Sequence, residues 1–269
     1  MIETLREIIN EHVLYRKQIM KLAKSDLIKT YRGAALGWSW AIINPMVTLF
    51  VFWFAFTIGL RSGKPIAGYP YFLWLEAGFL PWFYMKDLIV GGAGCIRRYS
   101  HLVTKMKFPI SIIPTYYNIA HIYVHLALLA ITVVMFLCFG FMPDIYMLQI
   151  PLYMFMMFAF FTVWALFAGM LSAISKDFQN LVNAFSSAIF WLSGIIYNVD
   201  DIRHAWIRIL LKFNPVTVIS SGYRNIFIYK KWFWEDQASL FCFSITFIVF
   251  FILALVFYRK LRKEIPDVL

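Results

Sequence analysis

The sequence lacks the motifs of nucleotide binding and of covalent catalysis. It contains no GxxxxGK[ST] phosphate-binding loop, no GxSxG nucleophile motif and no acidic cluster. Without the first motif the chain does not bind ATP through a P-loop, and without the other two it has no constellation for bond chemistry. We therefore expect neither a catalytic site nor a cofactor in this chain.

Cysteine is scarce, and acidic residues are outnumbered by basic ones. Cys95, Cys138 and Cys242 each lie inside an apolar run, with no metal-ligand spacing and no disulfide framework. Asp and Glu number 14 against 25 Lys and Arg, which gives a net charge of +11. The basic residues flank apolar runs instead of forming one polar face, a pattern typical of membrane proteins and not of nucleic-acid-binding proteins.

Apolar residues dominate what is present. They make up 62% of the chain, against roughly 45–50% in soluble domains. A membrane span needs about 20 apolar residues. The sequence therefore predicts an all-α integral membrane protein with six transmembrane helices and no soluble catalytic domain. The spans are expected at residues 38–60, 71–95, 111–140, 147–174, 179–198 and 238–258.

The distribution of Lys and Arg predicts the orientation of these spans. Segments on the N-terminal side of the membrane hold 16 of the 25 basic residues, the opposite side holds 8, among them Arg61 and Lys64, and Lys86 lies within a span. Because basic loops stay in the cytoplasm, we expect both termini there.

Residues 1–37 form the N-terminal segment before the first span. Apolar side chains recur at helical spacing over 3–30, with Lys and Arg between them, which predicts an amphipathic helix lying in the membrane interface. The alternative is a cytoplasmic helix packed on another subunit. These 37 residues are rich in polar side chains, so no cleavable signal peptide is expected.

Two segments outside the spans stand out. The loop 97–108 is basic and also apolar on one side, which fits either a docking helix for a cytoplasmic partner or a loop that only sets topology. The segment 202–229 is apolar on both sides of Asn214-Pro215. It predicts two short re-entrant helices at the outer face, with flat surface helices as the alternative.

Charged and polar residues inside the spans are candidates for function, because charges in a bilayer are expensive. Lys86 and Asp87 lie in the second span, and Glu76 lies nearer its outer end. The alternative to a substrate contact is a purely structural polar contact with another helix. His121 and His125 share a face of the third span, but the motif HIYVH has no glutamate and no third ligand follows. We expect no metal site there.

Several motifs together resemble a known family. They are LAKSDLIKTYRGAALGWSWAIINP from residue 22, with Thr30, Tyr31, Arg32 and Gly33 at its centre, AGFLPWFY at 77–84, VTKMKFPISIIP at 103–114, SKDFQN at 175–180 and FNPVTVISSGYRNIF at 213–227. Over essentially the whole length, the chain resembles type-2 ABC (ABC-2) exporter permeases that export polysaccharides and polyol phosphates. Within that group it looks most similar to wall teichoic acid permeases, with O-antigen and capsule permeases as near relatives.

The resemblance implies a working unit of two copies of this permease and two copies of a separate P-loop ATPase, which binds the ATP and Mg²⁺. It also implies an undecaprenyl-diphosphate-linked polymer as substrate and the segment 97–108 as the coupling helix. The coupling residues would be Arg97, Arg98, His101, Leu102, Lys105, Met106 and Phe108.

On this interpretation, Lys24, Lys29 and Arg32 attract the lipid diphosphate. Channel candidates that could contact the polymer are Trp38, Trp82, Tyr84, Lys86, Asp87 and Tyr197. The sequence thus predicts a multi-pass permease subunit of a bacterial cytoplasmic membrane, surrounded by lipid. The alternatives are an ABC-2 exporter of a small hydrophobic drug or lipid, a polytopic membrane enzyme, and a secondary transporter without an ATPase.

Overall fold

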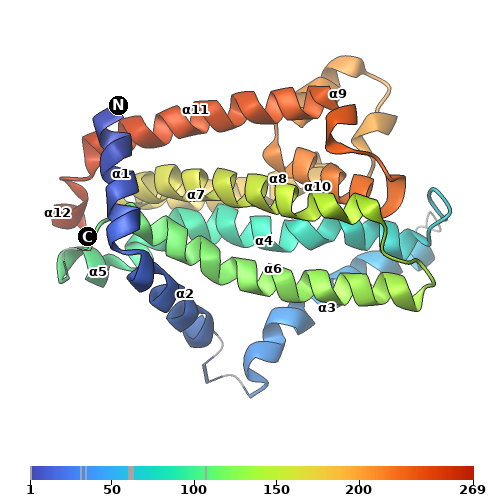
Figure 1. The fold of residues 1–269 in the computed structure, drawn as a ribbon, viewed down its shortest axis with the longest axis horizontal. Coiled ribbons are helices and arrows are strands. Elements are labelled where there is room, and N and C mark those ends of the chain that lie inside the picture. Colours follow the sequence, from blue (N-terminus) through green and yellow to red (C-terminus); the bar gives the residue numbers. More distant parts are fainter. Residues whose placement is uncertain (1, 31, 34, 60–63, 107) are drawn as a thin grey trace.

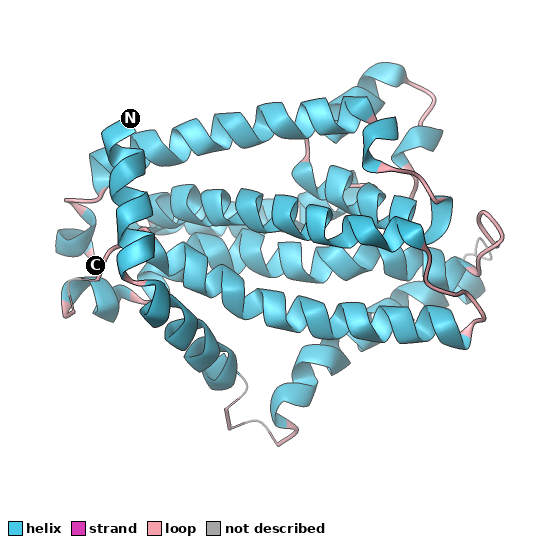
Figure 2. Cartoon of the chain, viewed as in Figure 1, coloured by secondary structure: helices cyan, strands magenta, loops and turns pink. Residues whose placement is uncertain are grey.

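The computed structural model describes residues 2–30, 32–33, 35–59, 64–106 and 108–269. Tyr31, Arg61 and Lys107, which the sequence analysis uses, lie outside the described residues. Within the described ranges the regular elements are helices and no β-strand is formed (Figure 2). The all-α class is therefore confirmed.

A bundle of long helices forms the body of the molecule (Figure 1). It consists of α3 (Trp40–Phe54), α4 (Tyr71–Arg98), α6 (Ile112–Cys138), α7 (Ile150–Ile174), α8 (Lys176–Leu192) and α11 (Gln237–Leu261). The remaining α-helices are α1 (Ile2–Leu14), α2 (Arg16–Thr30), α5 (Ser100–Thr104), α9 (Ala205–Lys212), α10 (Pro215–Arg224) and α12 (Ile265–Val268). Short 3₁₀ turns occur at Gly37–Ser39, Ile145–Gln149, Val199–Asp201 and Phe233–Glu235, and π-helical turns at Ala55–Gly59 and Asn225–Tyr229.

Helical segments with the length and composition of membrane spans are present in the described structure. They are Gly37–Gly59, Ile112–Cys138, Ile145–Ile174 and Gln237–Leu261. The helix α4 is long enough, at 28 residues, but it carries Glu76, Lys86 and Asp87. The helix α8 has only 17 residues, fewer than the about 20 of a usual span. The protein is multi-pass, and the count of six spans stays a prediction.

The helix α4 lies at the centre of the bundle. It packs against α7, α6, α10, α8 and α3, and most of its side chains are buried. A helix surrounded by protein can keep polar groups, since they meet other helices and cavities and not lipid. Small residues allow close packing: Gly92 of α4 lies against Ala165 of α7, and the Gly92 carbonyl faces Gly169. α4 is therefore the axis around which the candidate site is arranged.

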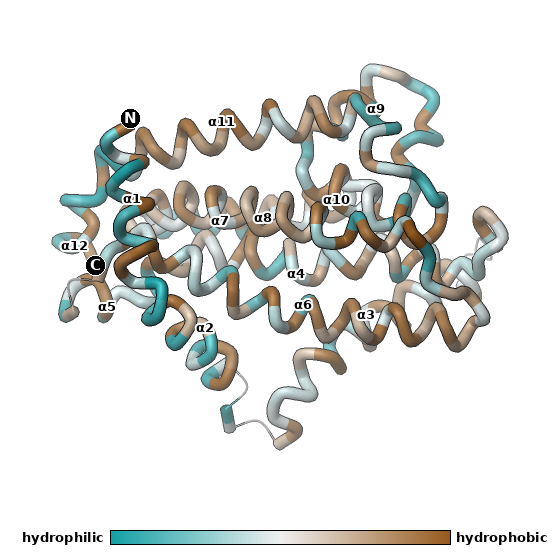
Figure 3. The backbone as a smooth tube through the Cα atoms, viewed as in Figure 1, coloured by the Kyte–Doolittle hydropathy of each residue, from teal (hydrophilic) through white to brown (hydrophobic). Residues whose placement is uncertain are grey.

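The two ends of the bundle differ. Both chain termini lie at one end, together with α1, α2, α5 and α12, and α9 lies at the other (Figure 1). Hydrophobic residues follow α3, α6, α7 and α11 along their length, and hydrophilic residues gather at the two ends (Figure 3). This distribution suits a bundle whose middle lies in a bilayer. That the end with the termini faces the cytoplasm stays a prediction.

The N-terminal segment differs from the single amphipathic helix expected over 3–30. It forms α1 and α2, which meet at a bend at Tyr15. The Tyr15 ring packs edge-on against Phe108, with ring centroids 5.1 Å apart. Glu11 of α1 accepts a hydrogen bond from the Tyr258 hydroxyl at 3.1 Å. These contacts hold α1 against the bundle. They explain the bend at Tyr15, because a single straight helix would not keep both of them.

Candidate functional site: a polar cavity and a basic docking end

A polar cavity of about 230 Å³ lies between α3, α4 and α6. Its polar lining comes from all three helices: Asn44 and Thr48 from α3, Lys86 and Asp87 from α4, and His121 and His125 from α6. The sequence singled out the last four separately, and the structure brings them to one cavity. Neither Asn44 nor Thr48 was predicted, although Asn44 precedes a proline inside a span.

Lys86 and Asp87 are exposed, although most of α4 is buried. Asp87 lies within electrostatic reach of His121, Lys86 and Arg98. Charged side chains kept inside a spanning helix face a water-filled space or a partner, since lipid cannot solvate them. The cavity therefore offers an ammonium group that can bind phosphate, and a carboxylate and an imidazole that can form hydrogen bonds with sugar hydroxyl groups.

The aromatic channel candidates of α4 are core residues. The Tyr84 hydroxyl donates to the side-chain oxygen of Asn118, and the Asn118 amide donates to the Thr162 hydroxyl at 2.7 Å. The Trp82 ring packs against Phe190 of α8 at 5.3 Å. Both residues border the cavity, and both also join α4 to its neighbours. Contact with a polymer stays a prediction for them.

The two histidines of α6 form hydrogen bonds with other groups of the protein. His121 Nδ1 lies 2.9 Å from the carbonyl oxygen of Tyr117, and His125 Nε2 lies 2.8 Å from the Tyr223 hydroxyl. In the described part of the chain, no group of three or more His, Cys, Asp or Glu residues is placed to hold a metal ion. The histidines thus contribute polarity and packing to the cavity.

The remaining channel candidates lie apart from the cavity. Trp38 is exposed in the 3₁₀ turn before α3. Tyr197 lies in the turn after α8, where its carbonyl oxygen accepts a hydrogen bond from Arg224 at 3.3 Å. The candidates predicted from the sequence therefore do not form one continuous lining within a single chain.

The expected coupling segment forms the short helix α5 and the turn that follows it. Its exposed side chains include His101, Lys105 and Met106, and Met106 is 66% exposed. We call these three residues the docking face. A flexible apolar side chain between polar ones suits a groove on another protein, because methionine adapts to irregular surfaces. Arg98 is also exposed, but its guanidinium group lies over the Tyr117 ring at 5.5 Å.

Other residues of the coupling segment face inward. Leu102 is buried, and Phe108 packs against Tyr15. Arg97 donates to the Ser172 carbonyl oxygen from Nε at 3.1 Å and from Nη2 at 2.8 Å, and to that of Ala173 from Nη2 at 2.8 Å. The last carbonyls of a helix have no partner within the helix. The hydrogen bonds of Arg97 therefore hold the end of α4 against the end of α7.

The basic residues expected to attract a lipid headgroup are available to do so. Lys24, Lys29 and Arg32 are exposed on α2 and in the turn after it. The other side of α2 is held by Asp26, which accepts a hydrogen bond from the Tyr99 hydroxyl between α4 and α5. Burial, together with this hydrogen bond, raises the pKa of Tyr99 above its ordinary value. The hydroxyl therefore stays protonated at neutral pH and connects α2 to the docking end.

Arg224 is a buried residue that was not predicted as functional. Its Nη1 donates to the Gly194 carbonyl oxygen at 2.6 Å, its Nη2 donates to that of Ile195, and the guanidinium group lies 3.6 Å above the Trp74 ring. Arg224 thus holds the turn after α8 against α4 and α10. The available signal was one charge in the otherwise uncharged stretch 213–229.

Asn214 and Asp236 organise α9, α10 and the start of α11. The side chain of Asn214 accepts a hydrogen bond from the backbone nitrogen of Val216 at 3.0 Å, so it caps α10 where the sequence predicts a break. Asp236 pairs with Lys212 at 3.0 Å. Burial raises the pKa of Asp236, but hydrogen bonds from Ser239 and Lys212 outweigh that effect and hold it below its ordinary value. The entry of α9 and α10 into a membrane stays a prediction.

Comparison with known proteins identifies similar chains. The O-antigen export system permease protein RfbA of Myxococcus xanthus is 24% identical over 221 residues, which cover 82% of this chain and 84% of that protein. An O-antigen export system permease protein RfbA of Klebsiella pneumoniae is 22% identical over 255 residues, which cover 93% and 94%.

The family comparison agrees with this similarity. The model of the ABC-2 type transporters matches residues 17–228, from the first turn of α2 to the π-helical turn after α10. The matched region holds the polar cavity, the docking face and the Arg224 cluster. It confirms the resemblance found from the sequence motifs, and the chain belongs to the ABC-2 type transporter family.

Proposed function

We propose that this chain is the transmembrane subunit of an ATP-driven exporter that moves a lipid-linked cell-surface polysaccharide out of the cytoplasm. The chain has no phosphate-binding loop, so hydrolysis belongs to a separate ATPase. Similar proteins are named for O-antigen export. They favour an O-antigen-type polysaccharide over teichoic acid as the polymer.

The observation that carries the proposal is a docking face connected through the protein to the helices of the transport path. α5 follows α4 directly, and α4 carries Lys86 and Asp87 at the polar cavity. Arg97 links the same end of α4 to the end of α7, next to α8. A push on α5 by an ATPase would therefore reach α4, α7 and α8 together, whereas a plain topological loop needs no such connections.

The exposed surface of α8 supports a second copy of the chain. Asn180, Asn183 and Ser187 are exposed on one face of this helix. Polar groups on a spanning helix require water or a protein partner, because lipid satisfies neither donors nor acceptors. In a two-fold dimer this face would border a path between the two copies. One chain alone is too small to enclose a wide polar path.

The lipid carrier would be recruited at the basic end. Exposed Lys24, Lys29 and Arg32 provide positive charge beside the first span, and basic clusters at a membrane surface attract phosphate. The polymer would then pass polar and aromatic groups that bind weakly at many points. No bond is made or broken by this chain in the proposed cycle.

The proposal is tested by removing the docking face in the complete transporter. The triple variant His101→Ala, Lys105→Ala, Met106→Ala, co-expressed with its ATPase, should lose co-purification of the ATPase and surface polysaccharide while staying in the membrane. The matched control is Arg259→Ala with Lys260→Ala, because these two residues are exposed near the same end and lie outside the docking face.

Outcomes that contradict the proposal are distinct. Undiminished ATPase binding and surface polysaccharide in the triple variant would remove the docking assignment. Unchanged surface polysaccharide in a strain without this permease, together with a loss of drug resistance, would favour the drug exporter. Export that persists when the ATPase carries an inactivated phosphate-binding loop would favour a secondary transporter.

A further inference from the structure

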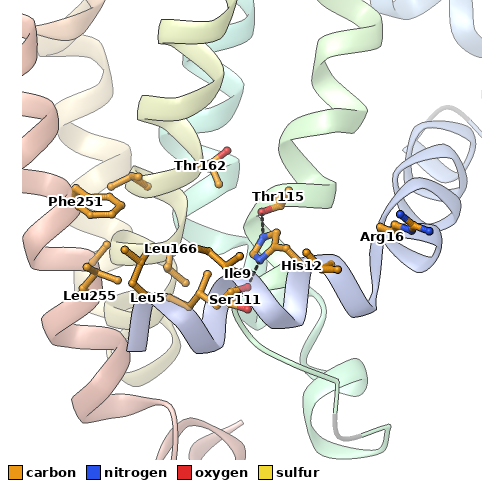
Figure 4. Close-up of a pocket in the computed structure, with 14 residues that line it drawn as sticks. Leu5, Ile9, His12, Arg16, Ser111, Thr115, Thr162, Leu166, Phe251 and Leu255 are labelled. Carbon is orange, nitrogen blue, oxygen red and sulfur yellow. Dashed lines mark hydrogen bonds between the residues drawn. The ribbon is translucent and has the colours of Figure 1, made fainter. Parts of the chain in front are cut away.

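A second cavity, of about 510 Å³, lies under α1 and apart from the polar cavity. Its walls come from α1, α6, α7 and α11, and Leu5, Leu166, Phe251 and Leu255 lie around the space between these helices, with Arg16 of α2 to one side (Figure 4). The apolar part of the lining includes Leu5, Ile9, Leu166, Phe251 and Leu255. Its volume falls in the range of about 300–1,000 Å³ that is usual for small-molecule sites.

The uncharged polar groups of the cavity wall, those of His12, Ser111, Thr115 and Thr162, are already hydrogen-bonded within the protein. His12 Nε2 lies 2.7 Å from the Thr115 hydroxyl, and His12 Nδ1 lies 2.7 Å from the Ile8 carbonyl oxygen (Figure 4). The Thr162 hydroxyl donates to the Phe158 carbonyl oxygen at 2.8 Å. Because these groups need no further partner, the interior favours an apolar occupant.

The edge of the cavity carries a positive charge. Arg16, at the start of α2, borders the cavity and is exposed. Among the described residues it makes no hydrogen bond or ion pair. The acidic residues of α1 are occupied elsewhere: Glu7 pairs with Arg262, and Glu11 accepts from Tyr258. An apolar cavity thus has the guanidinium group of Arg16 at its edge, unpaired within the described structure. This arrangement is complementary to a lipid with an apolar acyl chain and an anionic headgroup.

We propose that this cavity binds an acyl chain of an anionic phospholipid from the surrounding bilayer, with its phosphate at Arg16. The acyl chain is stabilised by van der Waals contacts with the cavity walls, which have no such contacts when the space is empty. The bilayer supplies acyl chains at high local concentration. The isoprenoid tail of a polymer carrier is much larger than this cavity, so it is not the occupant. The bound lipid is a structural ligand and not the cargo.

Photo-crosslinking tests the acyl-chain site. The whole protein in nanodiscs of phosphatidylcholine receives a trace of phosphatidylglycerol with a photoreactive acyl chain, and labelled peptides are mapped by mass spectrometry. Labelling is expected on α1, α7 and α11 at residues that line the cavity. Val163→Phe and Ala254→Phe, which place a ring in the cavity, should abolish it. Ile252→Phe is the matched control, because Ile252 is exposed on α11.

A surface variant tests the headgroup site without disturbing the packing. Arg16→Gln should reduce labelling by phosphatidylglycerol about fivefold, equivalent to the about 1 kcal/mol that one basic side chain contributes near an anionic surface. Labelling by a phosphatidylcholine probe should stay the same. Lys17→Gln, one residue away and exposed, is the control that should change neither.

Three results would overturn the proposal. The first is labelling of the cavity residues that survives in folded Val163→Phe and Ala254→Phe, because lipid would then contact only the outer surface. The second is equal labelling by both headgroups in the wild-type protein. The third is labelling by a photoreactive polyprenyl phosphate at these residues in place of the phospholipid, which would make the cavity a carrier site.

Discussion

Arg224 is fully buried between α4, α8 and α10, and its guanidinium group is satisfied by backbone carbonyls and by an aromatic ring. Trp74, Gly194, Ile195 and Tyr197 supply these acceptors. Buried cations persist only when every donor has a partner, because desolvation is otherwise too costly. Arg224 therefore stabilises the turn after α8 in the described structure.

Arg224→Met should destabilise the protein. The change leaves several buried carbonyl groups without donors, at about 1–3 kcal/mol for each. We expect a fall of about 10 °C or more in Tm, measured by size-exclusion chromatography after heating in detergent. The control is Arg203→Met, since Arg203 is exposed in the connection between α8 and α9. An unchanged Tm for Arg224→Met would show that the carbonyl contacts contribute nothing to stability.

Site residues could be predicted from the sequence where a charged group, which is costly to place in a bilayer, stands in an apolar run. Lys86 and Asp87 were found in this way and do border the polar cavity. Asn44 was missed as a cavity residue because an uncharged amide beside Pro45 gives no comparable signal. Arg97 was grouped with the docking residues because the family resemblance assigns the whole segment 97–108 to the coupling helix. Its contacts with the end of α7 depend on two distant segments meeting.

At the scale of elements, the proposed coupling depends most directly on the link between α4 and α7. Arg97 binds two of the final carbonyls of α7 with a planar group. A lysine keeps the charge but cannot present the same fork of donors. The docking face is a separate set of side chains on α5 and in the turn after it, so in the proposed cycle we expect that docking and transmission can be changed independently.

Arg97→Lys should therefore uncouple transport from hydrolysis. We expect the ATPase still to co-purify and to hydrolyse ATP, while export falls by about tenfold or more, since hydrogen bonds to a charged group contribute about 1.5–3 kcal/mol each. Surface polymer and ATPase rate are measured on the same membranes. Arg259→Lys, an exposed change near the same end, should leave both unchanged. Loss of ATPase binding in Arg97→Lys would place Arg97 in the docking contact instead.

Helix positions were largely predictable, because each apolar run imposes backbone hydrogen bonding within itself. The runs expected at 111–140 and 238–258 correspond to α6 and α11. The end of α8 at Leu192 and the bend at Tyr15 were not predicted. The hydrogen bonds of Arg224 to the turn after α8, and the packing of Tyr15 on Phe108, involve residues far apart in the chain.

At the scale of the whole molecule, the two ends of the bundle make the topology testable. Both termini lie at the end that holds α5. Met106 and Val268 are exposed near this end, and Met142 and Trp234 are exposed in the connections of the other. If α4 and α8 both span the bilayer, these two pairs of residues lie on opposite sides of the membrane.

Single cysteines at these four positions test on which side of the membrane each residue lies. They are introduced into a variant with Cys95, Cys138 and Cys242 replaced by Ser. A membrane-impermeant maleimide added to spheroplasts should label Met142→Cys and Trp234→Cys, and should label Met106→Cys and Val268→Cys only in inverted vesicles. Labelling of Trp234→Cys from the same side as Met106→Cys would mean that α8 does not cross the membrane.

The sequence by itself determined the class of the protein. Long apolar runs must form helices in a bilayer, and flanking Lys and Arg predict their orientation, so both properties follow from local composition. The family motifs are also local. Tertiary structure decided the rest: which of the polar residues share the 230 Å³ cavity, which loop residues face outward, and that α1 covers an apolar space of about 510 Å³. These features arise where distant helices meet, and packing between segments is not encoded in the composition of any one of them.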